Sequence, residues 1–232
     1  MRKVSVIVTH HLRENEKYLN AAVDSLHAQT VKPDIILVSS AEKKQFGWHH
    51  WDPELNNATK KVHYAVDNLI PEEHDIMLMS DDVVISPNTV EDLMSGAELG
   101  CIQNPISNNE HGSRWISFGE PHQPSYPYNP KLIDKVLKMS PGPKHMFQVP
   151  WISFYCTYIP REVWNKVGRL DERLEVRHND QDYCFRAARL GIPTFINTGG
   201  FALHFGSKTL PKVTSQEEYE KASQVFKEKY SL

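Results

Sequence analysis

The spacing of hydrophobic residues alternates between two periods along the first hundred positions. Short apolar runs rich in β-branched residues predict four buried strands, at Lys3–Thr9, Ile35–Val38, Val62–Val66 and Ile76–Met79. After the first run, apolar residues recur three or four positions apart at Leu19, Ala22, Val23 and Leu26, which predicts an amphipathic helix. Strands that alternate with helices at such short intervals indicate βαβ units.

The second half of the chain predicts a loop-rich stretch followed by further helices and strands. Residues 104–150 are rich in Pro, Gly, Asn and aromatic residues, so we expect long loops there with one helix, Pro130–Met139. Helix ends are marked by Ser86 before Pro87, by Gly191 after residues 179–190, and by a capping box of Ser215 and Glu218. Further strands are expected at 152–159, 193–197 and 201–205, with a helix begun by Pro160.

This order of elements predicts a single α/β domain with a mostly parallel central sheet flanked by helices. Ligands of such sheets bind at the carboxyl ends of the strands. Three polar segments, Thr9–His11, Ser39–Ala41 and Ser80–Asp82, follow predicted strands and are therefore expected along one rim of the sheet.

Composition is that of an ordinary globular protein. The chain has 232 residues, of which 40% are hydrophobic and 24% are charged, enough to bury a substantial core. Neither a membrane-spanning run nor a signal peptide is apparent, so we expect a soluble, cytoplasmic protein. Cys101, Cys156 and Cys184 are odd in number and lie in apolar surroundings, which indicates packed thiols. The net charge of −3 disfavours binding to nucleic acid or anionic lipid.

Three short constellations could carry chemistry. In Ser80–Asp82, two adjacent acids at a strand end could bind a divalent cation and a diphosphate, or could be solvated turn residues. In Asn179–Asp182, Asp180 lies at the end of the inward helix face and could act as a general base, while an acidic first turn could equally serve the helix dipole. His204 could be a ligand or an ordinary packed histidine. A zinc site on paired histidines is disfavoured, because neighbours on an extended chain point to opposite faces.

Taken together, these segments resemble glycosyltransferase family 2. The similarity begins at VSVIVTHHLRENEKYLNAAVDSLHAQTVKPDIILVSS and continues at HDIMLMSDDVVISPNTVEDLM, EVWNKVGRLDERL, NDQDYCFRAARLGIPTFI and ALHFGSKT. It is weakest in the central loops. The resemblance implies a GT-A fold, a nucleotide-binding Rossmann-like α/β domain, and the transfer of a sugar from a nucleotide-diphosphate sugar to an acceptor hydroxyl. Within one domain, it implies that residues 1–103 bind the nucleotide and residues 104–232 bind the acceptor and contain the catalytic residue.

The resemblance also assigns individual residues. The implied donor site consists of Thr9, His10, Ser39, Ser40, Asn68, Ser80 and Asp81. Asp82 holds the metal-binding second place of the family's Asp-x-Asp motif, and His204 matches a late histidine of the metal shell, so Mn²⁺ or Mg²⁺ is expected. Asp180 matches the catalytic acid of the Glu-Asp motif, and with no second nucleophile matched, an inverting displacement is expected.

Departures from the family pattern leave alternatives open. Ser80 replaces the usual first Asp, Asn179 replaces the acid before Asp180, and Ser39 and Ser40 lie where an acid usually contacts the base. A catalytically idle nucleotide-sugar-binding protein, or a glycosyltransferase acting on modified nucleic-acid bases, therefore remain as alternatives.

Aromatic side chains are the candidates for acceptor binding. Trp115, Trp151 and Tyr155 are predicted to contribute ring faces, whereas core packing is the favoured role of Trp164. The sugar, the base, the acceptor and the oligomeric state are not predicted.

Overall fold

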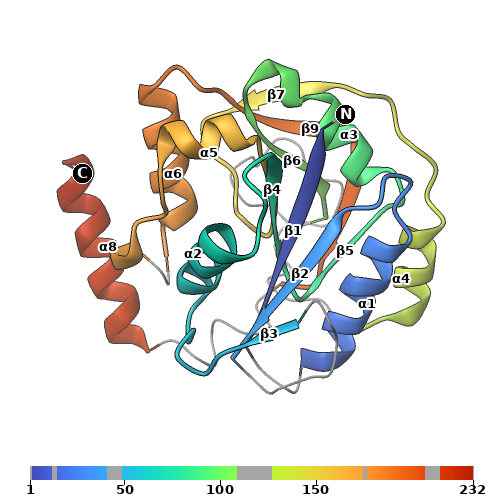
Figure 1. Ribbon diagram of the computed structural model, residues 1–232, viewed down its shortest axis with the longest axis horizontal. Helices are drawn as coiled ribbons and strands as arrows, with labels where there is room; N and C mark the ends of the chain where they lie inside the picture. Colours follow the sequence, from blue (N-terminus) through green and yellow to red (C-terminus); the bar gives the residue numbers. More distant parts are fainter. Residues whose placement is uncertain are drawn as a thin grey trace.

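A computed structural model describes residues 2–11, 15–40, 49–108, 127–174, 177–206 and 215–231. Nine strands of these residues form one sheet, drawn as arrows in Figure 1. In chain order the strands are β1 Lys3–His10, β2 Asp34–Ser39, β3 His49–Trp51, β4 His74–Ser80, β5 Val83–Ile85, β6 Ile102–Ser107, β7 Met146–Val149, β8 Cys156–Ile159 and β9 Thr194–His204. Their spatial order is β3-β2-β1-β4-β8-β6-β9-β5, and β7 pairs with β9.

The sheet is mixed. The pairs β1–β2, β1–β4, β2–β3 and β6–β9 are parallel, whereas β4–β8, β6–β8, β5–β9 and β7–β9 are antiparallel. The predicted single α/β sheet is thus confirmed, and its uninterrupted parallel part is β3-β2-β1-β4.

Seven α-helices of the described residues flank this sheet. They are α1 Glu16–His27, α2 Ala58–Asn68, α3 Thr89–Ser95, α4 Pro130–Leu137, α5 Arg161–Val167, α6 Asn179–Arg189 and α8 Gln216–Tyr230. Figure 1 shows α8 as the outermost element on the side of α6, with α1 and α4 on the opposite side of the molecule. None of the helices in the described ranges is both long and apolar enough to cross a membrane.

Alternating side chains of the strands divide the core between the two faces of the sheet. On β1, Ile7 packs in the cluster that contains residues of α2, α5 and α6. Its neighbours Val6 and Val8 point the other way, into the cluster built with α1 and α3. Both clusters consist of buried, mostly aliphatic residues. A fully buried Val, Leu, Ile, Phe or Met side chain contributes about 1.5–3 kcal/mol when it is removed from water. The three cysteines are buried free thiols, as predicted.

The segment predicted as a strand at Val62–Val66 is instead part of helix α2. Its apolar residues fit the period of a strand as well as that of a helix. Val62, Tyr64 and Val66 alternate as in a strand, whereas Val62, Ala65 and Val66 are spaced as on one face of a helix. The deciding feature precedes them: the Asn57 side chain accepts a hydrogen bond from the backbone N–H of Lys60 at 2.8 Å and caps the helix.

The region predicted as long loops contains two strands, β6 and β7. All six residues of β6 are buried, although polar residues and Pro105 hide its apolar pattern. The side-chain amides of Gln103 and Asn104 donate hydrogen bonds to the backbone carbonyls of Leu93 and Ser153. Proline has no N–H to donate to the neighbouring strand, and the pairing of β6 with β9 shifts register beside Pro105. The predicted helix at Pro130 is confirmed.

The two short strands predicted near the C-terminus form one continuous strand, β9. Gly199 and Gly200 lie within this strand. Glycine is needed there because helix α3 packs so closely on the strand that a side chain would not fit; the chain does not turn at these residues. A Cβ at Gly200 would lie 2.7 Å from the Cα atom of Thr89.

Helix starts and stops were predicted more accurately. The capping box of Ser215 and Glu218 begins α8, and Gly191 follows α6 at φ 73°. Ser86 does not cap α3, which begins after Asn88; its hydroxyl contacts Thr89 and accepts from the backbone N–H of Phe201.

Candidate active site

The carboxyl ends of β1 and β4 form the centre of the candidate site. The chain leaves β1 toward β2 and β3 on one side and returns to β4 on the other side. Such a reversal of strand order opens a crevice above the strand ends, where α/β proteins bind ligands. Thr9 pairs in register with Val38 and Ser80, and His10 pairs with Ser39. The structure therefore brings the predicted polar segments to one rim.

His10 and Asp81 join the two strands across this reversal. Nδ1 of His10 lies 2.6 Å from Oδ2 of Asp81, and both side chains are buried. Burial raises the pKa of Asp81, the neighbouring Asp82 raises it further, and His10 and Lys61 oppose this rise. The Asp81 carboxyl is thus held inside the protein, facing β1, and is not a solvated turn residue.

Asp82 faces the opposite way, toward the end of β9. Its Oδ1 lies 3.3 Å from Nε2 of His204. Pairing of β5 with β9 places Val83 opposite His204, and the Phe205 N–H donates to the Asp82 carbonyl at 3.0 Å. The predicted approach of Asp82 to His204, which are distant along the chain, is present.

The spacing of Asp82 and His204 suits two neighbouring ligands of one divalent cation. Two ligands at right angles in an octahedral shell, each about 2.1 Å from the ion, lie about 3 Å apart. Carboxylate oxygen and imidazole nitrogen are both suitable donors for such ions. Within the described residues no group of three His, Cys, Asp or Glu side chains could hold a metal, so these two would leave further positions to other ligands.

His204 is held from two sides. The Tyr155 ring stacks on the imidazole, with centroids 4.7 Å apart and an interplanar angle of 19°. Asn108 clamps the backbone, because its side chain accepts from the His204 N–H at 2.8 Å and donates to the His204 carbonyl at 3.1 Å. The orientation of the imidazole is therefore defined by packing.

Asp180 lies in the first turn of α6 and is linked to this region through the β7–β8 loop. Its carboxylate forms a hydrogen bond with the side chain of Ser153. Two residues farther, Tyr155 stacks on His204 and its carbonyl accepts from the Ser80 N–H at 3.0 Å. Burial raises the pKa of Asp180, against hydrogen bonds that lower it. Asp180 is thus connected with His204 indirectly, through Ser153 and Tyr155 of the β7–β8 loop.

Asp182 has a structural role. The side chain is fully buried, and its carboxylate contacts Arg186 Nε at 2.9 Å, Lys229 Nζ at 2.6 Å and Tyr230 Oη at 2.8 Å. These contacts fasten α8 to α6.

His178, directly before α6, makes a second contact with α8. Its backbone is left-handed, with φ 65°, and its ring stacks on that of Phe226 with the centroids 4.4 Å apart.

Lys61 also belongs to the rim and was not predicted, whereas its neighbour His11 lies in the predicted segment Thr9–His11. Lys61 on α2 is fully buried, and its Nζ lies 2.9 Å from Nδ1 of His11 and 3.1 Å from Oγ of Ser40. Burial lowers the pKa of Lys61 to about 7. Burial, together with the positive charge of Lys61, lowers the pKa of His11 to about 3. Once residues 58–68 are recognised as a helix, Lys61 shares the inward face with Val62 and Ala65, which is the signal that could have identified it.

Asn68 lies away from the predicted site, and Tyr155 lies within it but has another role. Asn68 ends α2 beside the start of β4, about 20 Å of strand away from Ser80, and its side chain donates to the Tyr64 carbonyl. Tyr155 is buried, one face stacks on His204, and its hydroxyl bonds Ser107 and Asn104; burial raises its pKa to about 12. It supports His204 and offers no free face to an acceptor.

The tryptophans differ from one another. Trp151 is partly buried against the core at the start of the β7–β8 loop, and Trp115 lies outside the described residues. Trp164 stacks on Tyr183 in the core, as favoured. Trp51, which was not predicted, is 42% exposed at the end of edge strand β3, opposite Ser39.

Comparison with solved structures identifies the fold. The chain is similar to GalNAc-T7 crystallised with UDP, GalNAc and Mn²⁺ (TM-score 0.65, 12% identity, 97% of this chain). It is also similar to S. aureus TarS (0.57, 14%, 96%) and to the mannosyltransferase PcManGT from Pyrobaculum calidifontis in complex with GDP-Man and Mn²⁺ (0.54, 12%, 90%). It spans 48%, 38% and 59% of those chains, respectively, which is less than two thirds of each.

The fold is therefore that of GT-A glycosyltransferases, as the sequence resemblance implied. No protein-family profile matches the sequence, and no similarity to a curated protein is detected.

Proposed function

We propose that this chain is a metal-dependent glycosyltransferase that moves a sugar from a nucleotide-diphosphate sugar to an acceptor hydroxyl. The observation that carries the proposal is the meeting of Asp82 with His204 beside the β1–β4 reversal, next to the buried His10–Asp81 pair. Support from the fold is the presence of UDP or GDP-Man, with Mn²⁺, in two solved GT-A structures similar to it.

The donor would occupy the rim formed by the carboxyl ends of β1, β2 and β4. Thr9, His10, Ser39, Ser40, Ser80 and Asp81 line this proposed site. Lys61 and His11 are added to it, because a buried ammonium without a carboxylate within ion-pair distance in the described residues suits an anionic ligand. Asn68 is left out.

Asp82 and His204 would hold Mn²⁺ or Mg²⁺. When bound, the cation would neutralise the diphosphate and the negative charge that develops on the leaving group. The Asp82–His204 spacing fits this role, and Tyr155 and Asn108 keep the imidazole in place for it.

Asp180 would be the general base of an inverting displacement. The acceptor oxygen would bond to the anomeric carbon, its proton would pass to the Asp180 carboxylate, and the bond to the diphosphate oxygen would break with its electron pair on that oxygen. The raised pKa of Asp180 makes its carboxylate a stronger base than an exposed one. Residues 1–103 would then bind the donor, and 104–232 the acceptor.

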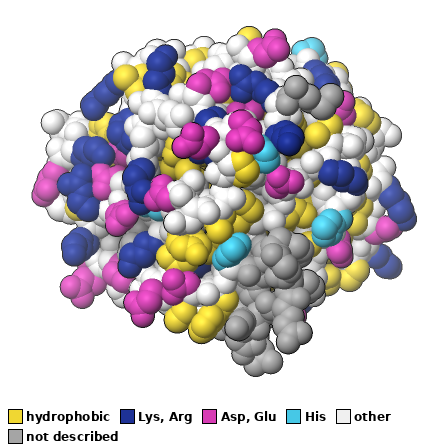
Figure 2. All heavy atoms as spheres, in the orientation of Figure 1, with side chains coloured by type: hydrophobic (Ala, Val, Ile, Leu, Met, Phe, Trp, Pro, Cys, Tyr) yellow, Lys and Arg dark blue, Asp and Glu magenta, His cyan; other side chains and the backbone are white. Residues whose placement is uncertain are grey.

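A catalytically idle donor-binding protein is the second candidate. It is favoured by Ser80, which is not an acid, and by Asn179, whose side-chain oxygen accepts from the Asp180 N–H at 2.7 Å and so caps α6. Action on nucleic acid gains no support: on the face in Figure 2, basic and acidic side chains of the described residues intermingle.

Thermal unfolding with UDP, GDP and dTDP, each with and without Mn²⁺, tests the proposal. One nucleotide at 100 times its Kd should stabilise the protein by about 2.7 kcal/mol, or roughly 5–10 °C for a chain of this size. Asp82→Asn should abolish the Mn²⁺-dependent part, whereas Asp134→Asn, an exposed acid of α4, should not. If none of the nucleotides stabilises the wild type, the proposal is wrong. Release of free sugar or transfer from the matching donor separates an active enzyme from an idle one.

A further inference from the structure

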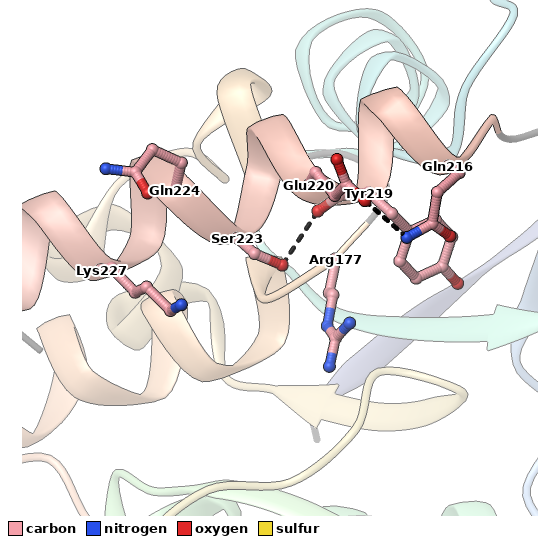
Figure 3. A pocket seen from close by; sticks show the side chains of 7 residues that line it. All are labelled: Arg177, Gln216, Tyr219, Glu220, Ser223, Gln224 and Lys227. Atoms are coloured by element: carbon pink, nitrogen blue, oxygen red, sulfur yellow. Dashed lines mark hydrogen bonds between the residues drawn. The ribbon is translucent and has the colours of Figure 1, made fainter.

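A second hollow lies on the outer side of the molecule, between α8 and the segment that leads into α6. It has a volume of about 290 Å³ and is lined by Arg177, Gln216, Tyr219, Glu220, Ser223, Gln224 and Lys227. Figure 3 shows Arg177 on that segment beside α8, with Ser223 and Lys227 farther along the helix. Its volume is at the lower limit of small-molecule sites, so it suits one group of a larger ligand.

The hollow carries a net positive charge. Arg177 and Lys227 have no acidic side chain within ion-pair distance among the described residues, in contrast to Arg186 and Lys229 nearby, which both pair with Asp182. The one acid of the lining, Glu220, instead accepts a hydrogen bond from Gln216 at 2.9 Å. Two cations and one acid therefore face the same space.

Arg177 is preorganised for an anion. Its guanidinium lies over the Tyr219 ring, 5.7 Å from the centroid, and this cation–π contact holds the group beside α8. A guanidinium edge matches the two oxygens of a carboxylate or phosphate, and a lysine adds a second charge.

The hollow is also close to Asp180 along the chain. Arg177 precedes Asp180 by three residues, so their Cα atoms lie within about 11 Å. The corner between them is fixed by the stacking of His178 on Phe226 of α8. A group bound at Arg177 is therefore bound close to the start of α6, the helix that carries Asp180.

We propose that this hollow binds a phosphate or carboxylate group of the acceptor, so that the acceptor is an anionic sugar or sugar polymer. The inference rests on the proposed transferase function, since it names the substrate class of that reaction. Residues of α8 thereby select the acceptor while the strand ends bind the donor.

Glucose 6-phosphate, glucuronate, glucose and inorganic phosphate are suitable probes. Their binding is followed by the NMR signal of the Arg177 Nε–H group, assigned by its loss in Arg177→Gln, and by calorimetry for each variant. We expect the two anionic sugars to bind and glucose not to bind. Arg177→Gln and Lys227→Gln should each weaken binding about tenfold or more, since each removes a charged hydrogen-bonding group. Lys221→Gln, an exposed α8 lysine outside the hollow, should bind as the wild type does.

Three results would overturn the inference: no anion moves the Arg177 signal, Lys221→Gln weakens binding as much as Arg177→Gln, or inorganic phosphate binds as tightly as glucose 6-phosphate. Thermal stabilisation by a nucleotide diphosphate with Mn²⁺ serves as the separate control. If it persists while no anionic sugar binds, only the acceptor assignment fails; if no nucleotide stabilises the wild type, the proposed function itself fails.

Discussion

Replacement of Lys61 by Met should stabilise the protein at neutral and acidic pH and weaken donor binding. Lys61 is fully buried, and its partners His11 and Ser40 carry no negative charge. A buried ammonium opposes folding when, as for Lys61, no carboxylate of the described residues lies within ion-pair distance and only the longer-range attraction of Asp81 opposes the effect of burial. A residue kept at such a cost indicates a functional requirement. Met fills a similar volume without a charge.

The size of the effect follows from the pKa of Lys61, which burial lowers from 10.5 to about 7. At about 1.36 kcal/mol per pKa unit, the charged Lys61 lowers the free energy of unfolding by about 5 kcal/mol. The sign is fixed by linkage: between pH 7 and 10.5 the unfolded chain binds the proton and the folded protein does not, so wild-type stability rises with pH. Below pH 7 the full penalty is present.

Urea unfolding of wild type and Lys61→Met at pH 6, 8 and 10 measures this. The stability of the variant relative to the wild type should be greatest at pH 6 and should fall by several kcal/mol toward pH 10. Lys60→Met is the matched control, because Lys60 reaches Asn56 on the exposed side of α2. A difference between Lys61→Met and wild type that stays constant over this pH range would refute the reasoning.

Two further substitutions separate catalysis from folding. Asp180→Asn should lower transfer about 10²- to 10⁴-fold with donor binding unchanged, as measured by initial rates and nucleotide affinity; full activity would contradict its role as base. Lys229→Met removes one of two cations from the buried Asp182 and should destabilise the protein by about 3 kcal/mol in urea unfolding. Lys221→Met should change stability by less than about 0.5 kcal/mol, and an equal effect of both would show that the Asp182 contacts contribute little.

The fold and the strand-end residues could be predicted because their signals are local. The β-branched run of β1 ends at Thr9 and His10, and β4 ends at Ser80, directly before Asp81 and Asp82. Because β1 and β4 are parallel neighbours, their carboxyl ends lie at the same rim of the sheet. The contact between Asp82 and His204 was reachable only through the family resemblance, since nothing local in the sequence joins them.

What escaped prediction depends on tertiary contacts. Lys61 could not be assigned to the site while the residues that follow it, Val62–Val66, were interpreted as a strand. The helix cap at Asn57 is a weak signal beside an ambiguous apolar run. The apolar pattern of β6 is interrupted by two buried polar residues, Gln103 and Asn104. Their side chains can be buried because they donate hydrogen bonds to carbonyls elsewhere in the sequence, which the sequence alone does not show. An exposed aromatic and a buried one look alike in sequence, so the role of Tyr155 beneath His204 emerged only from packing.

The central claim is that Asp82 and His204 hold one divalent cation beside a nucleotide diphosphate. Crystals grown with Mn²⁺ and the nucleotide that stabilises the protein best test it most directly, by anomalous scattering at the manganese edge. We predict one peak within about 2.3 Å of both Asp82 Oδ1 and His204 Nε2, with diphosphate oxygens completing the shell. A peak at other residues, or a nucleotide bound away from the β1–β4 reversal, would contradict the account.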